Sequence, residues 1–158
     1  MSDSMIRWHL LPFVALAALA CSNGPEAIET SGSGGAAPLA QLQQEGGFAG
    51  MSSALVVTQG GSATLIRNTP QPDTVRWTLS GTQLTRLEAL VASPDFAHTD
   101  STYVPANPCC DRITAALTIY RQGQPPRTIR TLEGADQPDV VEHTVRLLRD
   151  IIAAAPAN

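Results

Sequence analysis

The segment from Ile113 to Tyr120 most constrains the fold, because apolar side chains recur along it at every second position. This period of two is typical of a strand with one buried face. A turn that contains Gly123 follows, and residues 127–133 predict the return strand. A helix is then expected after Pro138, which suits a first turn. The apolar stripe of this helix comprises Val141, Val145, Leu147, Leu148, Ile151 and Ile152.

An earlier part of the chain repeats this arrangement of hairpin and helix. Strands are expected at residues 51–58, 63–67 and 75–79, with a glycine-containing turn between the first two. Ser80 predicts the start of a helix, because Gln83 stands three residues later as in a capping box. The apolar stripe of this helix comprises Leu84, Leu87, Leu90 and Val91, and Ser93 and Pro94 end it. The order β-β-β-α-β-β-α predicts an α+β fold, an antiparallel sheet of four to five strands with two helices packed on one face.

The beginning of the chain has the features of an export signal. Arg7 precedes an apolar run from Leu10 to Ala20, which is shorter than the roughly 20 residues of a transmembrane helix. The run ends in small residues followed by Cys21, and this stretch resembles the lipobox of bacterial lipoproteins. The resemblance implies a signal peptide over residues 1–20 and fatty acylation, such as palmitate, on Cys21. Synthesis starts at Met1 or Met5, and both starts leave the same mature chain.

The predicted location follows from that cysteine. Acyl chains on Cys21 anchor a protein to a membrane, and Ser22 rather than Asp favours the outer membrane in a host with two membranes. The alternative is an ordinary secretory signal with an incidental cysteine. Residues 21–45 are rich in Gly, Ser, Ala and Pro and predict a flexible tether. Residues 46–158 are then expected to form one globular domain.

Composition and motifs exclude several functions. The chain has no lysine and a net charge of −4, which argues against binding nucleic acid. Asp95, His98 and Asp100 share a polar loop, but no spacing fixes a metal geometry, so we expect solvated side chains there. There is no Gly-x-Ser-x-Gly elbow and no paired histidines. We therefore expect no catalytic residue, no metal, no cofactor and no small-molecule substrate.

The adjacent cysteines Cys109 and Cys110 are the only thiols left if Cys21 is acylated. In an oxidising envelope they can form a vicinal disulfide. Adjacent α-carbons lie about 3.8 Å apart, closer than disulfides prefer, so such a bond is strained and easily reduced. The alternative is two thiols that only pack.

Three glycines surround one phenylalanine in the segment Gly46-Gly47-Phe48-Ala49-Gly50. With the helix and stop over residues 84–96 and the Asp111-Arg112 pair entering a strand, this segment resembles emfourin. Emfourin is a small bacterial protein inhibitor of protealysin, a thermolysin-type metalloprotease. The resemblance covers residues 45–154 and implies an α+β domain that docks on a protease without doing chemistry.

The contact site that this resemblance suggests is Gly46, Gly47, Phe48, Ala49 and Gly50. The alternative is that the glycines only start a strand and place Phe48 in the core. The sequence thus favours a membrane-anchored binding lipoprotein whose partner is a thermolysin-like metalloprotease. A structural or assembly lipoprotein of the cell envelope is the second hypothesis, and a thiol redox module is the third.

Overall fold

The computed structural model describes residues 36–48, 50–68, 71–109 and 111–157. The chain divides into two units, residues 1–32 and residues 33–158, and only the second contains described residues. The predicted signal peptide, Cys21 and the tether up to residue 35 therefore lie outside the described part.

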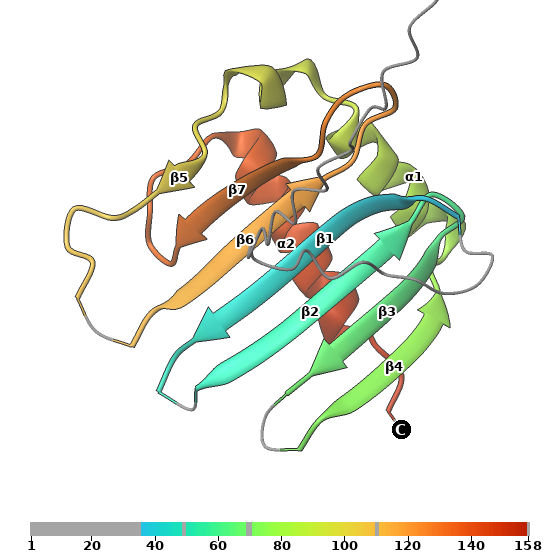
Figure 1. Ribbon diagram of the computed structural model, residues 1–158, viewed down its shortest axis with the longest axis horizontal. Coiled ribbons are helices and arrows are strands. Elements are labelled where there is room, and N and C mark those ends of the chain that lie inside the picture. The colour runs from blue at the N-terminus through green and yellow to red at the C-terminus, as the bar shows by residue number, and fades with distance from the viewer. Residues whose placement is uncertain (1–35, 49, 69–70, 110, 158) are drawn as a thin grey trace, which may run out of the picture. The chain divides into compact units, whose positions relative to one another are not determined.

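The described chain forms one sheet and two α-helices (Figure 1). The strands are β1 (Pro38–Gly46), β2 (Met51–Thr58), β3 (Ser62–Arg67), β4 (Asp73–Thr78), β5 (Thr102–Tyr103), β6 (Ile113–Ile119) and β7 (Arg127–Leu132). The helices are α1 (Gly81–Val91), the short 3₁₀ helix η1 (Pro94–His98) and α2 (Asp139–Ala153). The strand order across the sheet is β4-β3-β2-β1-β6-β7-β5.

Strand β1 corrects the predicted tether and domain boundary. Residues 38–45 are not a tether but most of a strand in the middle of the sheet, paired with β2 on one side and β6 on the other. Ala40 and Leu42 are buried, whereas Gln43 and Glu45 are exposed. The alternation covers only a few residues and lies among glutamines and small residues, so the segment is not recognisable as a strand in the sequence. The domain therefore begins before Pro38 and not at Gly46.

Strand β5 corrects the predicted sheet. Its two residues lie in the segment expected to be a loop, and they pair parallel with β7. Every other pair in the sheet is antiparallel, as expected. The α+β class is confirmed, but the sheet is mixed and has seven strands instead of four to five.

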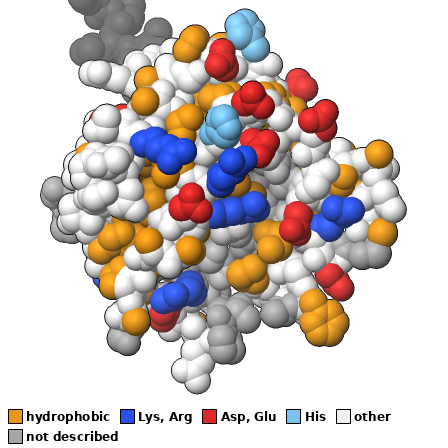
Figure 2. Space-filling view, turned by 180° about the vertical axis from the view of Figure 1, so that it is seen from behind, with side chains coloured by type: hydrophobic (Ala, Val, Ile, Leu, Met, Phe, Trp, Pro, Cys, Tyr) orange, Lys and Arg blue, Asp and Glu red, His pale blue; other side chains and the backbone are white. Residues whose placement is uncertain are grey.

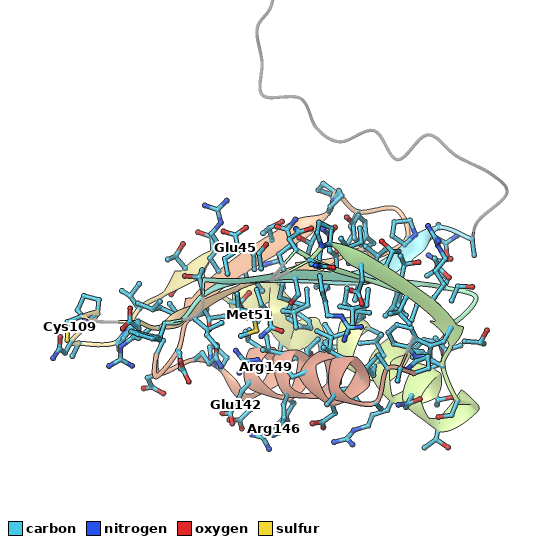
Figure 3. All side chains as sticks on the ribbon, turned by 90° about the horizontal axis from the view of Figure 1, so that it is seen from below. Glu45, Met51, Cys109, Glu142, Arg146 and Arg149 are labelled. Carbon is cyan, nitrogen blue, oxygen red and sulfur yellow. The ribbon has the colours of Figure 1, made fainter. Side chains whose placement is uncertain are left out.

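Both α-helices lie on one face of the sheet, as the side view in Figure 3 shows. Helix α1 begins with the expected capping box: the Gln83 backbone N–H donates to the Ser80 hydroxyl at 3.3 Å, and the Ser80 N–H donates to the Gln83 side chain at 3.0 Å. Two orphan N–H groups of the helix start are thereby satisfied. Pro138 is the N-cap of α2, so the helix begins directly after it, as expected.

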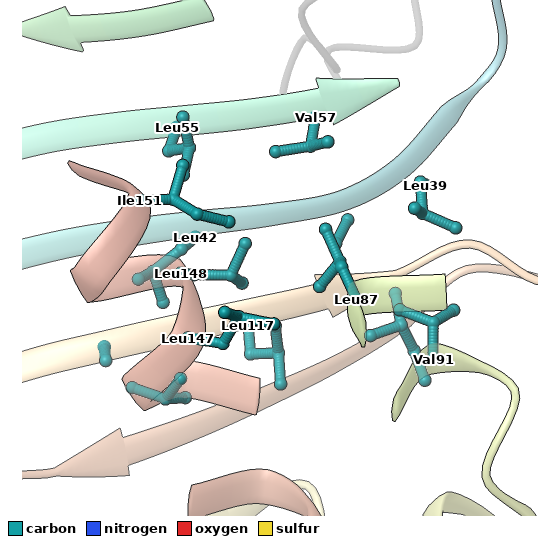
Figure 4. Close-up of a cluster of buried hydrophobic side chains, with 14 of the residues drawn as sticks. Leu39, Leu42, Leu55, Val57, Leu87, Val91, Leu117, Leu147, Leu148 and Ile151 are labelled. Carbon is teal, nitrogen blue, oxygen red and sulfur yellow. The ribbon is translucent and has the colours of Figure 1, made fainter. Parts of the chain in front are cut away.

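The core lies between the sheet and the helices (Figure 4). The sheet contributes Leu42, Leu55, Leu65, Leu117 and Ile129, and the helices contribute Leu87, Val91, Val141, Leu148 and Ile151. Phe96 of η1 is fully buried among them. The predicted stripes of both helices are confirmed, except that Leu84, Leu90 and Ile152 are only partly buried.

An ion pair closes the β3–β4 hairpin. The Arg67 guanidinium donates two hydrogen bonds to the Asp73 carboxylate, at 2.9 Å and 2.7 Å. These hydrogen bonds, together with the positive charge, hold the pKa of Asp73 below its usual value.

The lowered pKa predicts a pH-dependent contribution of Asp73 to stability. Since the folded-state pKa lies below the unfolded value of about 3.9, the contribution is present above that pH and is lost as the pH falls through the folded pKa. We expect Asp73→Asn to lower the melting temperature slightly at pH 7, because both groups are solvated. The difference from wild type should shrink as the pH falls below about 3.9 and through the lower folded-state pKa. A difference that stays constant down to about pH 2 would contradict the assignment.

Candidate docking site

The candidate contact segment lies in the turn between β1 and β2. The Gly50 N–H donates to the Gly47 carbonyl at 2.9 Å, which closes a four-residue turn with Phe48 at its first central position. Gly46, Gly47 and Gly50 all have positive φ, at 109°, 73° and 59°. Such angles favour glycine, which explains why three glycines surround one phenylalanine. Ala49 lies outside the described residues.

Phe48 points away from the core. Its exposed fraction is 95%, the highest of the large apolar residues that the structure describes as exposed. The alternative that the glycines place Phe48 in the core is therefore wrong. The strands on both sides of the turn are central in the sheet, so an exposed aromatic ring stands on a supported backbone.

The end of the sheet where β1 ends carries the β3–β4 connection and three further segments: the β1–β2 turn (46–50), the β5–β6 loop (104–112) and the β7–α2 turn (133–138) (Figure 1). We call this end the turn end. Arg112 joins the three segments. Its guanidinium donates to the carbonyl of Cys109 at 3.2 Å and to that of Glu133 at 2.7 Å. Its own carbonyl accepts from the Gly47 N–H at 3.4 Å.

Glycine is also required beside Arg112 for steric reasons. A Cβ at Gly46 would lie 2.5 Å from the Arg112 carbonyl oxygen. At Gly134, where φ is 81°, a Cβ would lie 2.6 Å from Nη1 of the same arginine. At Gly46 the backbone thus approaches the Arg112 carbonyl more closely than a residue with a Cβ allows, whereas at Gly134 the nearby atom is the end of a flexible side chain.

This close approach predicts different costs for two glycine substitutions. Gly46→Ala should destabilise the domain by about 2–4 kcal/mol, because positive φ and collision with a backbone oxygen add. Gly50→Ala should cost only about 1–2 kcal/mol, because it has positive φ but no atom within 4 Å of the added Cβ. Urea unfolding of both variants gives the comparison. Equal losses in the free energy of unfolding would mean that the structure moves the Arg112 carbonyl away from the added Cβ without loss of stability.

The other residues considered from the sequence do not converge on a second site. Cys109 is exposed in the β5–β6 loop, and Cys110 lies outside the described residues, so the vicinal disulfide stays a prediction. Asp95, His98 and Asp100 are exposed. Within the described residues, no group of three His, Cys, Asp or Glu side chains could hold a metal ion.

The helix side of the domain carries charges of both signs (Figure 2). On α2 the exposed charged side chains are Asp139, Glu142, Arg146, Arg149 and Asp150, and Glu142 pairs with Arg146 one turn away. Figure 3 shows Glu142, Arg146 and Arg149 on the side of α2 turned away from the sheet. Mixed charges of this kind are typical of a solvated helix face. In the described part, no helix is long and apolar enough to cross a membrane.

The chain matches no known family model and no curated protein. Sequence reasoning found the glycine-framed turn, but it missed Arg112 as the residue that joins the three segments. The signal was slight, because the sequence shows only one arginine at the start of a strand. The carbonyls that this arginine contacts come from a loop and from a turn 21 residues away.

Proposed function

We propose that this chain is a membrane-anchored, non-enzymatic binding lipoprotein whose domain inhibits a thermolysin-like metalloprotease through the β1–β2 turn. One observation carries the proposal: Phe48, with an exposed fraction of 95%, stands at the tip of a turn held in the centre of the sheet. The segment is one of the three features on which the resemblance to emfourin rests. An aromatic side chain of this kind can serve as the anchor of an interface, because such anchors are enriched in aromatic residues.

The structure of the β1–β2 turn is better suited to a protease inhibitor than to a substrate that the protease cleaves. β1 pairs with β2 over Pro38–Gly46 and with β6 over Ala40–Gly46, so the chain before Phe48 is hydrogen-bonded on both sides. A protease cleaves segments that can open locally, and this turn is tied to the rest of the sheet. Phenylalanine also has only two side-chain torsions to fix, so ordering it on binding costs little.

The point at which the described chain enters the domain leaves the β1–β2 turn accessible under the proposed anchor at Cys21. Residues 36 and 37 approach β1 at the end opposite Phe48, where the Gln59 N–H donates to the Ala37 carbonyl at 2.8 Å. β1 then runs nine residues to the turn end, which spans about 27 Å at 3.3 Å per residue. The chain upstream of residue 36 therefore joins the domain at the end opposite Phe48, so the β1–β2 turn lies away from the attachment point.

Titration of a thermolysin-like metalloprotease tests the proposed function. A soluble form that starts at residue 33 keeps β1 whole. It should reduce peptidase activity saturably, with a stoichiometry near one, and mass spectrometry should find it uncleaved afterwards. Full activity at micromolar concentrations of the domain would contradict the proposal for that protease. An envelope protein that copurifies with such an inactive domain would favour the assembly hypothesis.

Fatty-acid labelling tests the anchor separately. The chain expressed in a bacterium should incorporate labelled palmitate and sediment with membranes. The Cys21→Ser variant should do neither, because its +1 position lacks the thiol that is acylated. Membrane association that persists without label would show that another feature holds the chain.

A further inference from the structure

The exposed large apolar side chains of the described residues gather toward one end of the sheet. They are Phe48, Met51, Ile66 and Val104. Met51 pairs with Gly46 at the end of β1, and Ile66 is the second-last residue of β3, which ends on the same side. Val104 is the most distant of them along the chain, and 63% of it is exposed. Because most of its surface is in solvent, the Val104 side chain contributes little to the core.

Val104 lies at the same end of the sheet as Phe48, although the two residues are far apart in sequence. It follows the Tyr103–Thr131 pair of β5 and β7 by one residue, which places it at the turn end. Three strand spacings separate β5 from β1, about 14 Å at 4.8 Å each. A standard protein interface buries about 800 Å² per partner, a patch about 30 Å across. An interface of this size has room for both Phe48 and Val104.

The loop that carries Val104 is tied to the turn that carries Phe48. The Arg112 guanidinium donates a hydrogen bond to the Cys109 carbonyl in the β5–β6 loop. The Arg112 carbonyl accepts one from the Gly47 N–H in the β1–β2 turn. The two apolar side chains thus belong to one supported surface. Such support lowers the entropy lost when a partner binds.

The charges at the turn end indicate what kind of face binds there. Glu45, Asp111 and Glu133 are exposed. Of the arginines described at this end, Arg112 donates to carbonyl groups and Arg67 pairs with Asp73. A partner complementary to this surface has apolar pockets with a basic rim.

We propose that Val104 is a second apolar contact of the protease-docking surface, filling a pocket separate from the one that takes Phe48. The inference rests on the proposed function and adds to it a specificity-determining residue. It predicts a bipartite interface, with the aromatic anchor on the β1–β2 turn and the aliphatic one on the β5–β6 loop. The loop position decides which proteases fit.

The test compares inhibition constants of the full chain in a mild detergent against a thermolysin-like metalloprotease. Val104→Asp and Val104→Arg should each raise the inhibition constant about tenfold or more, because a charge at a buried apolar contact is desolvated. Gln124→Asp, an exposed change in the β6–β7 turn at the opposite end, should leave it within about twofold. Melting temperatures should stay at the wild-type value, since Val104 contributes little to the core.

The outcomes separate the inference from the proposed function. If wild type inhibits and both Val104 variants inhibit equally well, the second contact is wrong while the proposed function stands. Opposite effects of Asp and Arg would show long-range charge rather than contact, and would also overturn it. If wild type leaves the protease fully active, the proposed function fails and the inference fails with it.

Discussion

A chain truncated to begin at Gly46 is expected not to fold, although the composition of the removed segment suggests a dispensable linker. The truncation deletes a central strand that pairs with β2 and with β6. It also removes Leu39, Ala40 and Leu42 from the core. Loss of one buried leucine alone costs about 2–5 kcal/mol. Since a domain of this size is stable by only about 5–15 kcal/mol, the combined loss exceeds what it can tolerate.

Circular dichroism and thermal unfolding check this prediction. The truncated chain should lack a cooperative transition, whereas a control chain that begins at residue 33 should unfold cooperatively. Leu42→Ala in the control chain provides an intermediate case, with β1 present but one fully buried side chain shortened. A cooperative transition in the chain that begins at Gly46 would mean that β2 and β6 pair without β1.

The elements that the sequence predicted are those with a clear period. In β6, Ala115, Leu117 and Ile119 are buried and alternate with less buried residues, and the antiparallel partner β7 follows a short turn. Both helices have a stripe of four or more apolar positions. Such signals lie within one segment of the sequence, so they can be recognised without knowledge of the tertiary structure.

The missed elements depend on tertiary contacts. β1 has few strongly β-forming residues, and it is a strand because β2 and β6 offer it hydrogen-bonding partners on both sides. β5 has only two residues, too few for any period, and it exists through pairing with Thr131 and its neighbour on β7. Neither context can be read from the segment itself.

The candidate site divides in the same way. The glycines around Phe48 are visible in the sequence, because positive φ requires that residue type. The direction of the Phe48 side chain cannot be predicted from the sequence. The same glycine-rich pattern fits both an exposed turn and the start of a strand. The position of Val104 at the turn end depends on the parallel β5–β7 pair, which no local pattern in the sequence predicts.

Phe48→Ala is expected to weaken inhibition of the metalloprotease about 100-fold, roughly 2.8 kcal/mol, without destabilising the domain. Anchor residues of interfaces are aromatic side chains that fill a pocket and lose their water on binding. An exposed fraction of 95% means that the unbound domain gains almost nothing from this ring. The loss should therefore appear in binding alone, as a faster dissociation of the complex.

Three matched variants make the measurement specific. Phe48→Leu should retain inhibition within about tenfold, because it keeps an apolar side chain at the tip. Gln124→Ala, exposed at the opposite end of the sheet, should inhibit like wild type. Gly50→Ala disturbs the turn without touching the ring, so it reports how far the turn conformation matters. If Phe48→Ala inhibits as strongly as wild type while Val104→Asp does not, the anchor lies on the β5–β6 loop instead. If neither change matters, the partner binds a surface other than the turn end.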